Sequence, residues 1–340
     1  MKAVIFKKGI GLHYSEVPDL IPEPDQVLLK VSNTGFCGSD HSLIETEGTP
    51  DGIILGHEVS GSVVDKGPAV KDVDIGMKAI IRPTYCGECI GCKSGRPELC
   101  SSNRRSIGIG DLPGGFAEYI KVYPQMLIPI PDSVDSQNAA LAELFAVGLH
   151  GIYRSGKHSG SALVIGAGAV GLALVKILKI LEYGPIAVSE PMESKRKLAE
   201  KFGADLSINP LKDDLLSETF RHRGAAGFDT VFECSGLSTM LATAMNVAGP
   251  TASVCQLSVI YEDVSINPAV LMFKELNLTG SYGNTHQENR QCLNWMAEGK
   301  LNGKDLISDW CSLEELPEVY KTKIHTGESI KVMLNIGEEF

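Results

Sequence analysis

The chain has 340 residues, enough for two domains, and its hydrophobic fraction of 43% and charged fraction of 21% are those of an ordinary globular protein. Its formal net charge is −11 and it has no lysine or arginine run, which argues against nucleic acid and anionic membrane surfaces as partners. The N-terminal residues lack the apolar core of a secretory signal, and no apolar stretch is long enough to span a bilayer. We therefore expect a cytoplasmic protein.

Short strands separated by turn residues predict a β-rich first third. The expected strands are residues 1–8, 26–33, 59–65 and 77–83, with glycine, proline and aspartate between them.

From about residue 161 the pattern changes to short apolar strands that alternate with helices. We expect strands at residues 161–165, 185–190, 206–209, 228–233, 251–257 and 276–281, and helices at 169–181 and 193–202. This alternation predicts a parallel, doubly wound sheet, so the fold class is α/β. A last helix at residues 288–296 and a strand at 330–336 should return to the first domain.

Four cysteines lie close together in the sequence, at Cys86, Cys89, Cys92 and Cys100. The glycines between them allow a tight loop. Four thiolates that converge suit a tetrahedral zinc ion with no open position, so such a site would be structural. A cluster of buried or disulfide-bonded cysteines is the alternative, and the spacing and the expected intracellular location argue against it.

A glycine-rich turn, Gly166-Ala-Gly-Ala-Val-Gly171, connects an expected strand to an expected helix. Gly166 would make the turn, Gly168 would let the backbone approach a pyrophosphate, and Gly171 would pack the helix against the strand. The N–H groups at the start of the helix would face the phosphates. We expect Gly166, Gly168, Val170 and Gly171 to bind a dinucleotide coenzyme.

Glu190 ends the second strand of this region, nineteen positions after Gly171. A carboxylate there would accept hydrogen bonds from the ribose hydroxyls and repel a 2′-phosphate, so NAD is favoured over NADP. Lys195 and Arg196 follow on the next helix and could reach a phosphate, which keeps NADP as the less favoured alternative. A glycine turn beside a solvated surface glutamate is the non-functional interpretation.

Cys37, His57 and Glu143 could supply sulfur, nitrogen and oxygen ligands to a second zinc ion with one open position. Taken one at a time, each residue is more often structural. As a set, they predict a catalytic metal site.

Together these motifs resemble the zinc-dependent medium-chain alcohol dehydrogenases, in the polyol (sorbitol) dehydrogenase branch. The matching segments are the cysteine quartet, the glycine turn, Gly35-Phe-Cys-Gly-Ser-Asp40, Gly56-His-Glu58, Gly114-Gly-Phe-Ala-Glu-Tyr119 and Leu141-Ala-Glu-Leu-Phe-Ala146. They occur in the family's order, and the resemblance covers essentially the whole chain. It implies a GroES-like, mostly-β catalytic domain over residues 1–130, a Rossmann coenzyme domain over 131–285, a returning C-terminal segment over 286–340, and an active site in the cleft between the domains.

The resemblance also implies roles for single residues. Cys37 and His57 match the first two catalytic zinc ligands, and Glu143 matches the third. Glu58 is either a ligand or a neighbour that exchanges with water, and Ser39 matches the hydroxyl that relays the substrate proton. The family uses both arrangements of Glu58, so the sequence does not choose between them.

The sequence departs from the family in two relevant places. Ser42 replaces the histidine that the polyol branch usually has five residues after the first cysteine, and His41 precedes it, so the proton path beyond Ser39 stays open. The usual Glu-Pro is Glu143-Leu144 here, which could shift the carboxylate.

The resemblance implies an oxidoreductase with two zinc ions per chain that transfers a hydride from a secondary alcohol to NAD, as a homodimer or homotetramer. The substrate would be a polyol or a sugar-derived alcohol; Arg82, Arg104 and Arg105 raise the alternative of a sugar acid, although surface arginines explain them equally well. A threonine-type amino-alcohol dehydrogenase is a second interpretation. A non-catalytic protein that binds NAD or zinc on the same fold is a third.

Overall fold

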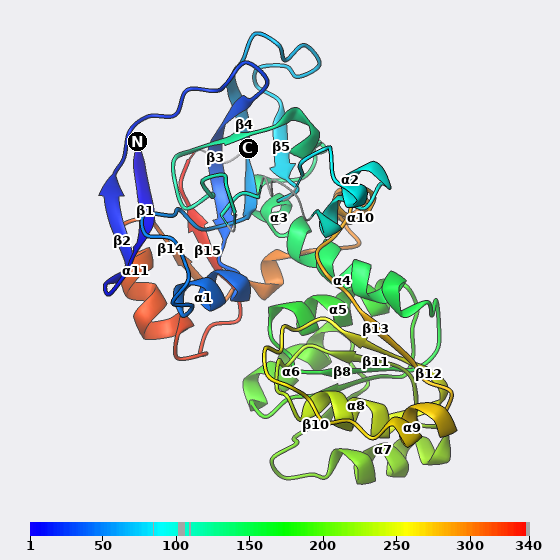
Figure 1. Cartoon of the computed structure of the whole chain (residues 1–340). Coiled ribbons are helices and arrows are strands. Elements are labelled where there is room, and N and C mark those ends of the chain that lie inside the picture. Colours follow the sequence, from blue (N-terminus) through cyan, green and yellow to red (C-terminus); the bar gives the residue numbers. More distant parts are fainter. Residues whose placement is uncertain (84, 101–105, 109, 338–340) are drawn as a thin grey trace. The chain divides into compact units, whose positions relative to one another are not determined.

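The computed structural model describes residues 1–83, 85–100, 106–108 and 110–337. The chain forms two compact units, and each is described here by itself (Figure 1). Unit 1 comprises Met1–Glu143 and Asn284–Phe340, and unit 2 comprises Leu144–Gly283. Within the described residues, no helix combines the length and the apolar character that crossing a membrane requires.

A seven-stranded sheet forms the centre of unit 1. Its strand order is β14 (Asp309–Cys311), β15 (Val332–Asn335), β3 (Val27–Gly35), β4 (Glu58–Lys66), β5 (Lys78–Ile81) and β7 (Leu127–Pro129), and β6 (Tyr119–Val122) also pairs with β3. All of these pairs are antiparallel except the parallel pair of β14 and β15. A separate hairpin joins β1 (Lys2–Lys7) to β2 (Gly11–Glu16).

The C-terminal strand brings distant residues to the end of β3. In the antiparallel register of β15 and β3, Met333 pairs with Gly35. Lys331, just before β15, is therefore held near the chain that follows β3. The alternation of β3 explains its place in the sheet, since Val27, Leu29 and Val31 are fully buried in the core of the unit.

Short helices complete unit 1. They are α1 (Gly38–Ile44), α2 (Ile90–Lys93), α3 (Ser136–Ala140), α10 (His286–Ala297) and α11 (Leu316–Val319), and α4 (Ala142–Ser155) begins at the border with unit 2. A 3₁₀ turn, Pro97–Leu99, follows α2, and a π-helical turn, Tyr320–Ile324, follows α11. Two further 3₁₀ turns cover Pro124–Met126 and Lys304–Leu306.

Unit 2 is a six-stranded parallel sheet, which confirms the predicted doubly wound α/β fold. Its strand order is β10 (Leu206–Ile208), β9 (Ile186–Ser189), β8 (Ala162–Ile165), β11 (Phe228–Glu233), β12 (Ala248–Gln256) and β13 (Asn277–Gly280). Helices α5 (Ala169–Ile180) and α6 (Glu193–Phe202) lie on one side, and α7 (Leu215–Arg223), α8 (Met240–Val247) and α9 (Pro268–Phe273) on the other (Figure 1).

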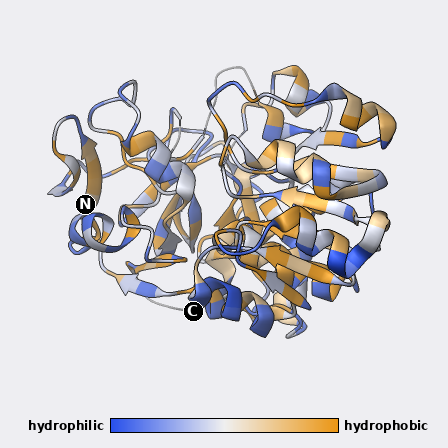
Figure 2. Cartoon of the chain, turned by 90° about the horizontal axis from the view of Figure 1, so that it is seen from below, coloured by the Kyte–Doolittle hydropathy of each residue, from blue (hydrophilic) through white to orange (hydrophobic). Residues whose placement is uncertain are grey.

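The central strands of this sheet are apolar because both of their faces are covered. All four residues of β8 and all four of β9 are buried, and the central strands of the sheet are coloured as hydrophobic in Figure 2. The chain order reverses between β8 and β11, so the carboxyl end of β8 lies at the switch point where such sheets bind ligands.

Candidate functional site

The four clustered cysteines converge in unit 1. Their four sulfur atoms all lie within 4.8 Å of one another. None of the nine cysteines, all of them described, forms a disulfide bond, so the disulfide alternative is wrong. Backbone N–H groups point at the sulfurs, as Cys89 N donates to Cys86 Sγ at 3.3 Å and Cys92 N donates to Cys89 Sγ at 3.4 Å. This donor set fits a tetrahedral zinc ion.

Arg82 and Glu98 are buried neighbours of the cysteine loop. Burial lowers the pKa of Arg82 to about 10, against the opposing effects of Cys92, Glu98 and Cys100. Glu98 accepts a hydrogen bond from Arg96 Nε at 2.8 Å. The exposed fraction of Arg82 is 1%, so the interpretation of Arg82 as a surface arginine is wrong. Arg104 and Arg105, the other two residues of the sugar-acid hypothesis, lie outside the described residues.

A second group of ligand-type side chains joins α1 to β4. Atoms of Cys37, His57 and Glu58 lie within 4.8 Å of one another. Cys37 is the N-cap of α1, and Glu58 is the first residue of β4. The hydroxyl of Ser39 lies 3.3 Å from Cys37 Sγ and 3.3 Å from His57 Nε2. Sulfur, nitrogen and oxygen donors at this spacing fit a zinc ion with one open coordination position.

Asp40 holds two members of this group in place. It is fully buried; its Oδ2 accepts a hydrogen bond from Cys37 N at 2.9 Å, and its Oδ1 lies 3.4 Å from His57 Nδ1. Burial alone would lower the pKa of His57, but Asp40 and then Cys37 raise it well above the usual value. Sequence reasoning missed Asp40, although an acidic residue three positions after a helix N-cap is a recognisable capping signal.

Lys331 supplies a buried positive charge beside the same group. Its Nζ donates to Glu58 Oε1 at 2.5 Å and to the carbonyl oxygen of Phe36 at 3.1 Å. A Cβ at Gly35, the end of β3, would lie 2.0 Å from Glu58 Oε2, so a larger residue there would displace the Glu58 carboxylate. Lys331 is 273 residues from Glu58 in the sequence, and no local pattern predicted the pair.

Glu143 lies outside the group formed by Cys37, His57 and Glu58. Asn284 Nδ2 donates to Glu143 Oε1 at 2.7 Å, and Asn289 Nδ2 donates to Asn284 Oδ1 at 2.7 Å. Burial raises the pKa of Glu143 to about 6, with His57 opposing the shift and Glu58 adding to it. Glu143 is thus close enough to interact with both residues, but Glu58 is the carboxylate that joins the cysteine and the histidine.

The glycine turn has the backbone that a dinucleotide turn needs. Gly166 has a φ of +93°, a conformation that other residues rarely adopt. A Cβ on Gly171 would lie 1.9 Å from the carbonyl oxygen of Gly166, whereas a Cβ on Gly168 would meet nothing within 4 Å. Gly168 is the N-cap of α5, and Val170 is half-buried in its first turn. The turn therefore leaves space at the helix start for a phosphate group.

Glu190 is a buried residue under this turn and not a solvated surface glutamate. Its Oε2 accepts a hydrogen bond from Ala167 N at 2.9 Å, and its Oε1 accepts one from Met192 N at 2.9 Å. Arg196 Nη1 donates to the backbone carbonyl oxygens of Glu190 and Pro191, both at 2.7 Å.

Sequence reasoning missed a second buried carboxylate at the carboxyl end of the sheet. Glu233 ends β11 and pairs in register with Ile165 at the end of β8. It accepts hydrogen bonds from Ser235 N at 2.8 Å and Gln256 Nε2 at 2.9 Å. Glu233 thereby fixes the loop after β11 next to the glycine turn.

Comparisons with known proteins assign the family. Residues 23–132 match the alcohol dehydrogenase GroES-like domain, and residues 169–298 match the zinc-binding dehydrogenase family. The sorbitol dehydrogenase of Bacillus subtilis is 30% identical over 98% of this chain and 97% of its own length. The chain belongs to the zinc-dependent medium-chain alcohol dehydrogenase family.

Other relatives differ in their named substrate, and one is a solved structure with bound coenzyme. The L-threonine 3-dehydrogenase of Pyrococcus horikoshii is 32% identical over 89% of this chain and 88% of its own length. A solved zinc-binding dehydrogenase from Sinorhizobium meliloti, bound to NADP, is 33% identical with a TM-score of 0.90 over 98% of both chains. The chain is therefore a zinc-dependent, nicotinamide-dependent dehydrogenase that acts on alcohols, with a GroES-like domain and a Rossmann-like domain.

Proposed function

We propose that this dehydrogenase oxidises the secondary alcohol of a polyol or sugar-derived compound, with NAD as the hydride acceptor. The observation that carries the proposal is the group of Cys37, His57 and Glu58 with the Ser39 hydroxyl 3.3 Å from two of its members. The similarity to sorbitol dehydrogenase over nearly the whole chain supports the substrate class.

Cys37, His57 and either Glu58 or Glu143 would hold the catalytic zinc, and the cysteine quartet would hold a structural zinc. When bound, zinc supplies a Lewis acid and the nicotinamide ring accepts the hydride. The Ser39 hydroxyl would accept the proton of the substrate hydroxyl and pass its own onward. Asp40 holds the His57 ring toward Ser39, and Lys331 Nζ donates a hydrogen bond to the Glu58 carboxylate.

Steady-state kinetics combined with metal analysis test the zinc and Ser39 assignments. Cys37→Ala and Ser39→Ala should each lower kcat strongly, and only Cys37→Ala should also lower the zinc content from two to one per chain. Cys311→Ala is the control, since Cys311 is buried in the same unit and outside both sets. Near-normal turnover in Cys37→Ala would refute the proposal.

A substrate screen separates the polyol proposal from the threonine-type alternative. NAD reduction would be followed with polyols, sugar acids and amino alcohols, with zinc present. Turnover confined to amino alcohols would favour the alternative, to which the similarity to L-threonine 3-dehydrogenase points.

Glu190 supports NAD over NADP, with Gly166, Gly168, Val170 and Gly171 at the phosphates. Its buried carboxylate stands at the end of β9 beside the glycine turn, where it would repel a 2′-phosphate. Arg196 is bonded to backbone carbonyl oxygens in this region and is the group that could attract that phosphate. Glu190→Gln should therefore lower the ratio of kcat/KM for NAD to that for NADP by at least about tenfold, because it removes a like-charge repulsion; an unchanged ratio would contradict the role of Glu190.

We also propose a homodimer or homotetramer formed through β13. This strand is the edge of the six-stranded sheet, and the neighbouring α9 exposes 63% of Met272 and 80% of Phe273. Light scattering would measure the mass, and Phe273→Glu should shift the protein toward the monomer. We expect a cytoplasmic location, which the nine cysteines without a disulfide bond support.

A further inference from the structure

A third cluster of metal-binding side chains lies in unit 1. His41 lies on α1, and Glu45 is the C-cap residue of that helix. His325 is the C-cap residue of the π-helical turn after α11. One ligand atom of each residue lies within 4.8 Å of the other two. None of the three belongs to the two zinc sets described above.

Tyr320 fixes which nitrogen of His41 can bind a metal. The Tyr320 hydroxyl donates to Glu45 Oε1 at 2.8 Å and lies 3.0 Å from His41 Nδ1. Because its single proton goes to Glu45, His41 Nδ1 must be the donor in the second contact, which leaves the lone pair on Nε2. Metal-binding histidines commonly donate through their other ring nitrogen in this way. Burial and then the bond to Glu45 raise the pKa of Tyr320, so the hydroxyl keeps its proton.

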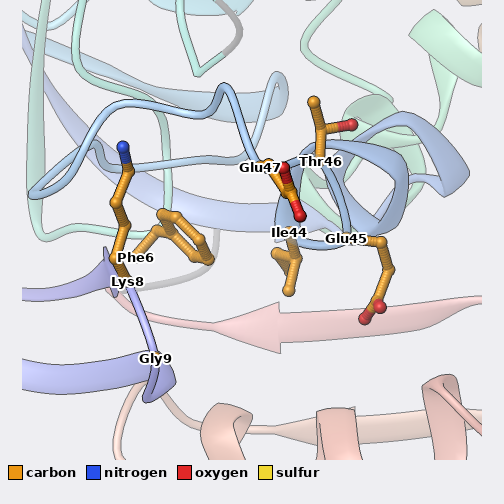
Figure 3. A pocket seen from close by; sticks show the side chains of 7 residues that line it. All are labelled: Phe6, Lys8, Gly9, Ile44, Glu45, Thr46 and Glu47. Atoms are coloured by element: carbon orange, nitrogen blue, oxygen red, sulfur yellow. The ribbon is translucent and has the colours of Figure 1, made fainter.

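His325 completes the cluster from the C-terminal segment. Its ring stands edge-on to that of His41 with 5.7 Å between the centroids, and its Nδ1 lies 3.6 Å from Glu45 Oε1. The side chains of His325 and Glu45 are 55% and 52% exposed, so an ion in solution can reach them. In Figure 3 the Glu45 carboxylate and the Thr46 side chain extend in opposite directions.

We propose that His41, Glu45 and His325 form a third site, on the surface, for a divalent transition-metal ion. Two imidazoles and one carboxylate are the donor types of zinc, nickel and copper sites, whereas magnesium and calcium prefer oxygen ligands. Water would fill the remaining positions. The ion would link the end of α1, whose N-cap is Cys37, to the segment that follows α11.

Zinc titration of the zinc-loaded enzyme tests the site. The resident zinc is counted first by metal analysis, and Zn²⁺ is then added in a calorimeter. The wild type should bind one equivalent beyond its resident content, and added zinc should raise its unfolding temperature. His325→Ala should weaken this binding at least about tenfold and abolish the temperature shift.

His222→Ala is the matched control. His222 is also exposed and lies 3.5 Å from a glutamate, Glu218, but it belongs to no group of three ligands in the described part of the chain. Its removal should leave the additional equivalent unchanged. Absence of that equivalent in the wild type, equal affinity in His325→Ala, or equal weakening by both substitutions would overturn the proposal. The result does not depend on the substrate of the enzyme.

Discussion

Replacing Lys331 with methionine should destabilise unit 1 by about 3–5 kcal/mol, because the substitution leaves a buried carboxylate without its cation. The side chains of Lys331 and Glu58 are 1% and 0% exposed, so water cannot replace the lost partner. Burial opposes the charge of Lys331, but Glu58 and then Cys37 outweigh it and raise the pKa of the lysine. The ammonium group therefore offsets the negative charge of its acidic neighbours in this group.

The expected loss corresponds to a fall of about 6–20 °C in unfolding temperature for a unit of this size. Scanning calorimetry at fixed scan rate would measure it, in zinc-loaded and in chelator-treated protein. The loss should be larger after chelation, because a bound zinc ion would also offset the negative charge of this group, and the chelator removes it. A double variant, Lys331→Met with Glu58→Gln, should lose less than the single variant, since it removes the unpaired charge.

Lys300→Met is the matched control. Lys300 Nζ lies 2.7 Å from Glu298 Oε2, but these side chains are 60% and 51% exposed. Exposed pairs of this kind contribute about 0–1 kcal/mol. If Lys331→Met cost no more than Lys300→Met, or if the double variant were as unstable as the single one, the argument from buried charge would be refuted.

Four further variants probe other parts of the molecule. Cys92→Ser should reduce the zinc content from two ions to one per chain and lower the unfolding temperature, while KM stays unchanged. Full retention of zinc in metal analysis would contradict this. Gly171→Ala should destabilise unit 2, because its Cβ would lie 1.9 Å from Gly166 O. Gly168→Ala should keep the stability of the protein and weaken NAD binding, because its Cβ would meet nothing within 4 Å. Thermal unfolding measures the first effect and NAD titration the second; equal losses of stability in the two variants would contradict this. Burial and two neighbouring arginines lower the pKa of His286 from 6.5 to about 4, so its neutral form stabilises the fold above pH 6.5 and that contribution is lost as the pH falls toward 4. His286→Gln should therefore lose less stability than the wild type over this window in acid unfolding, and parallel curves would refute the assignment.

Local patterns in the sequence predicted the elements of unit 2 closely. The expected helix at 193–202 and the strand at 228–233 have the bounds of α6 and β11 in the structure. Strand β12 begins at Ala248 instead of the expected residue 251, so it includes Gly249 and Pro250, which are uncommon inside strands. The structure keeps them in the strand, next to a shift of register against β11.

The candidate site was only partly predictable. Cys37 and His57 lie in short glycine-containing motifs that the sequence displays directly. Lys331 and Asn284 contact site residues 273 and 141 positions away, and those pairings depend on the packing of the whole unit. Hydropathy moreover predicts that lysine and glutamate are exposed, so a fully buried pair such as Lys331–Glu58 contradicts the usual signal.

The position of Lys331 so late in the chain also has a consequence for synthesis on the ribosome. All six strands of unit 2 are translated before the last 57 residues, Asn284–Phe340, emerge. Domains generally fold as units during translation, so unit 2 can mature while unit 1 still lacks β14, β15 and the cation beside Glu58. A nascent chain arrested before residue 331 would thus contain every proposed zinc ligand yet expose the edge of β3, which makes it a substrate for chaperones rather than an early enzyme.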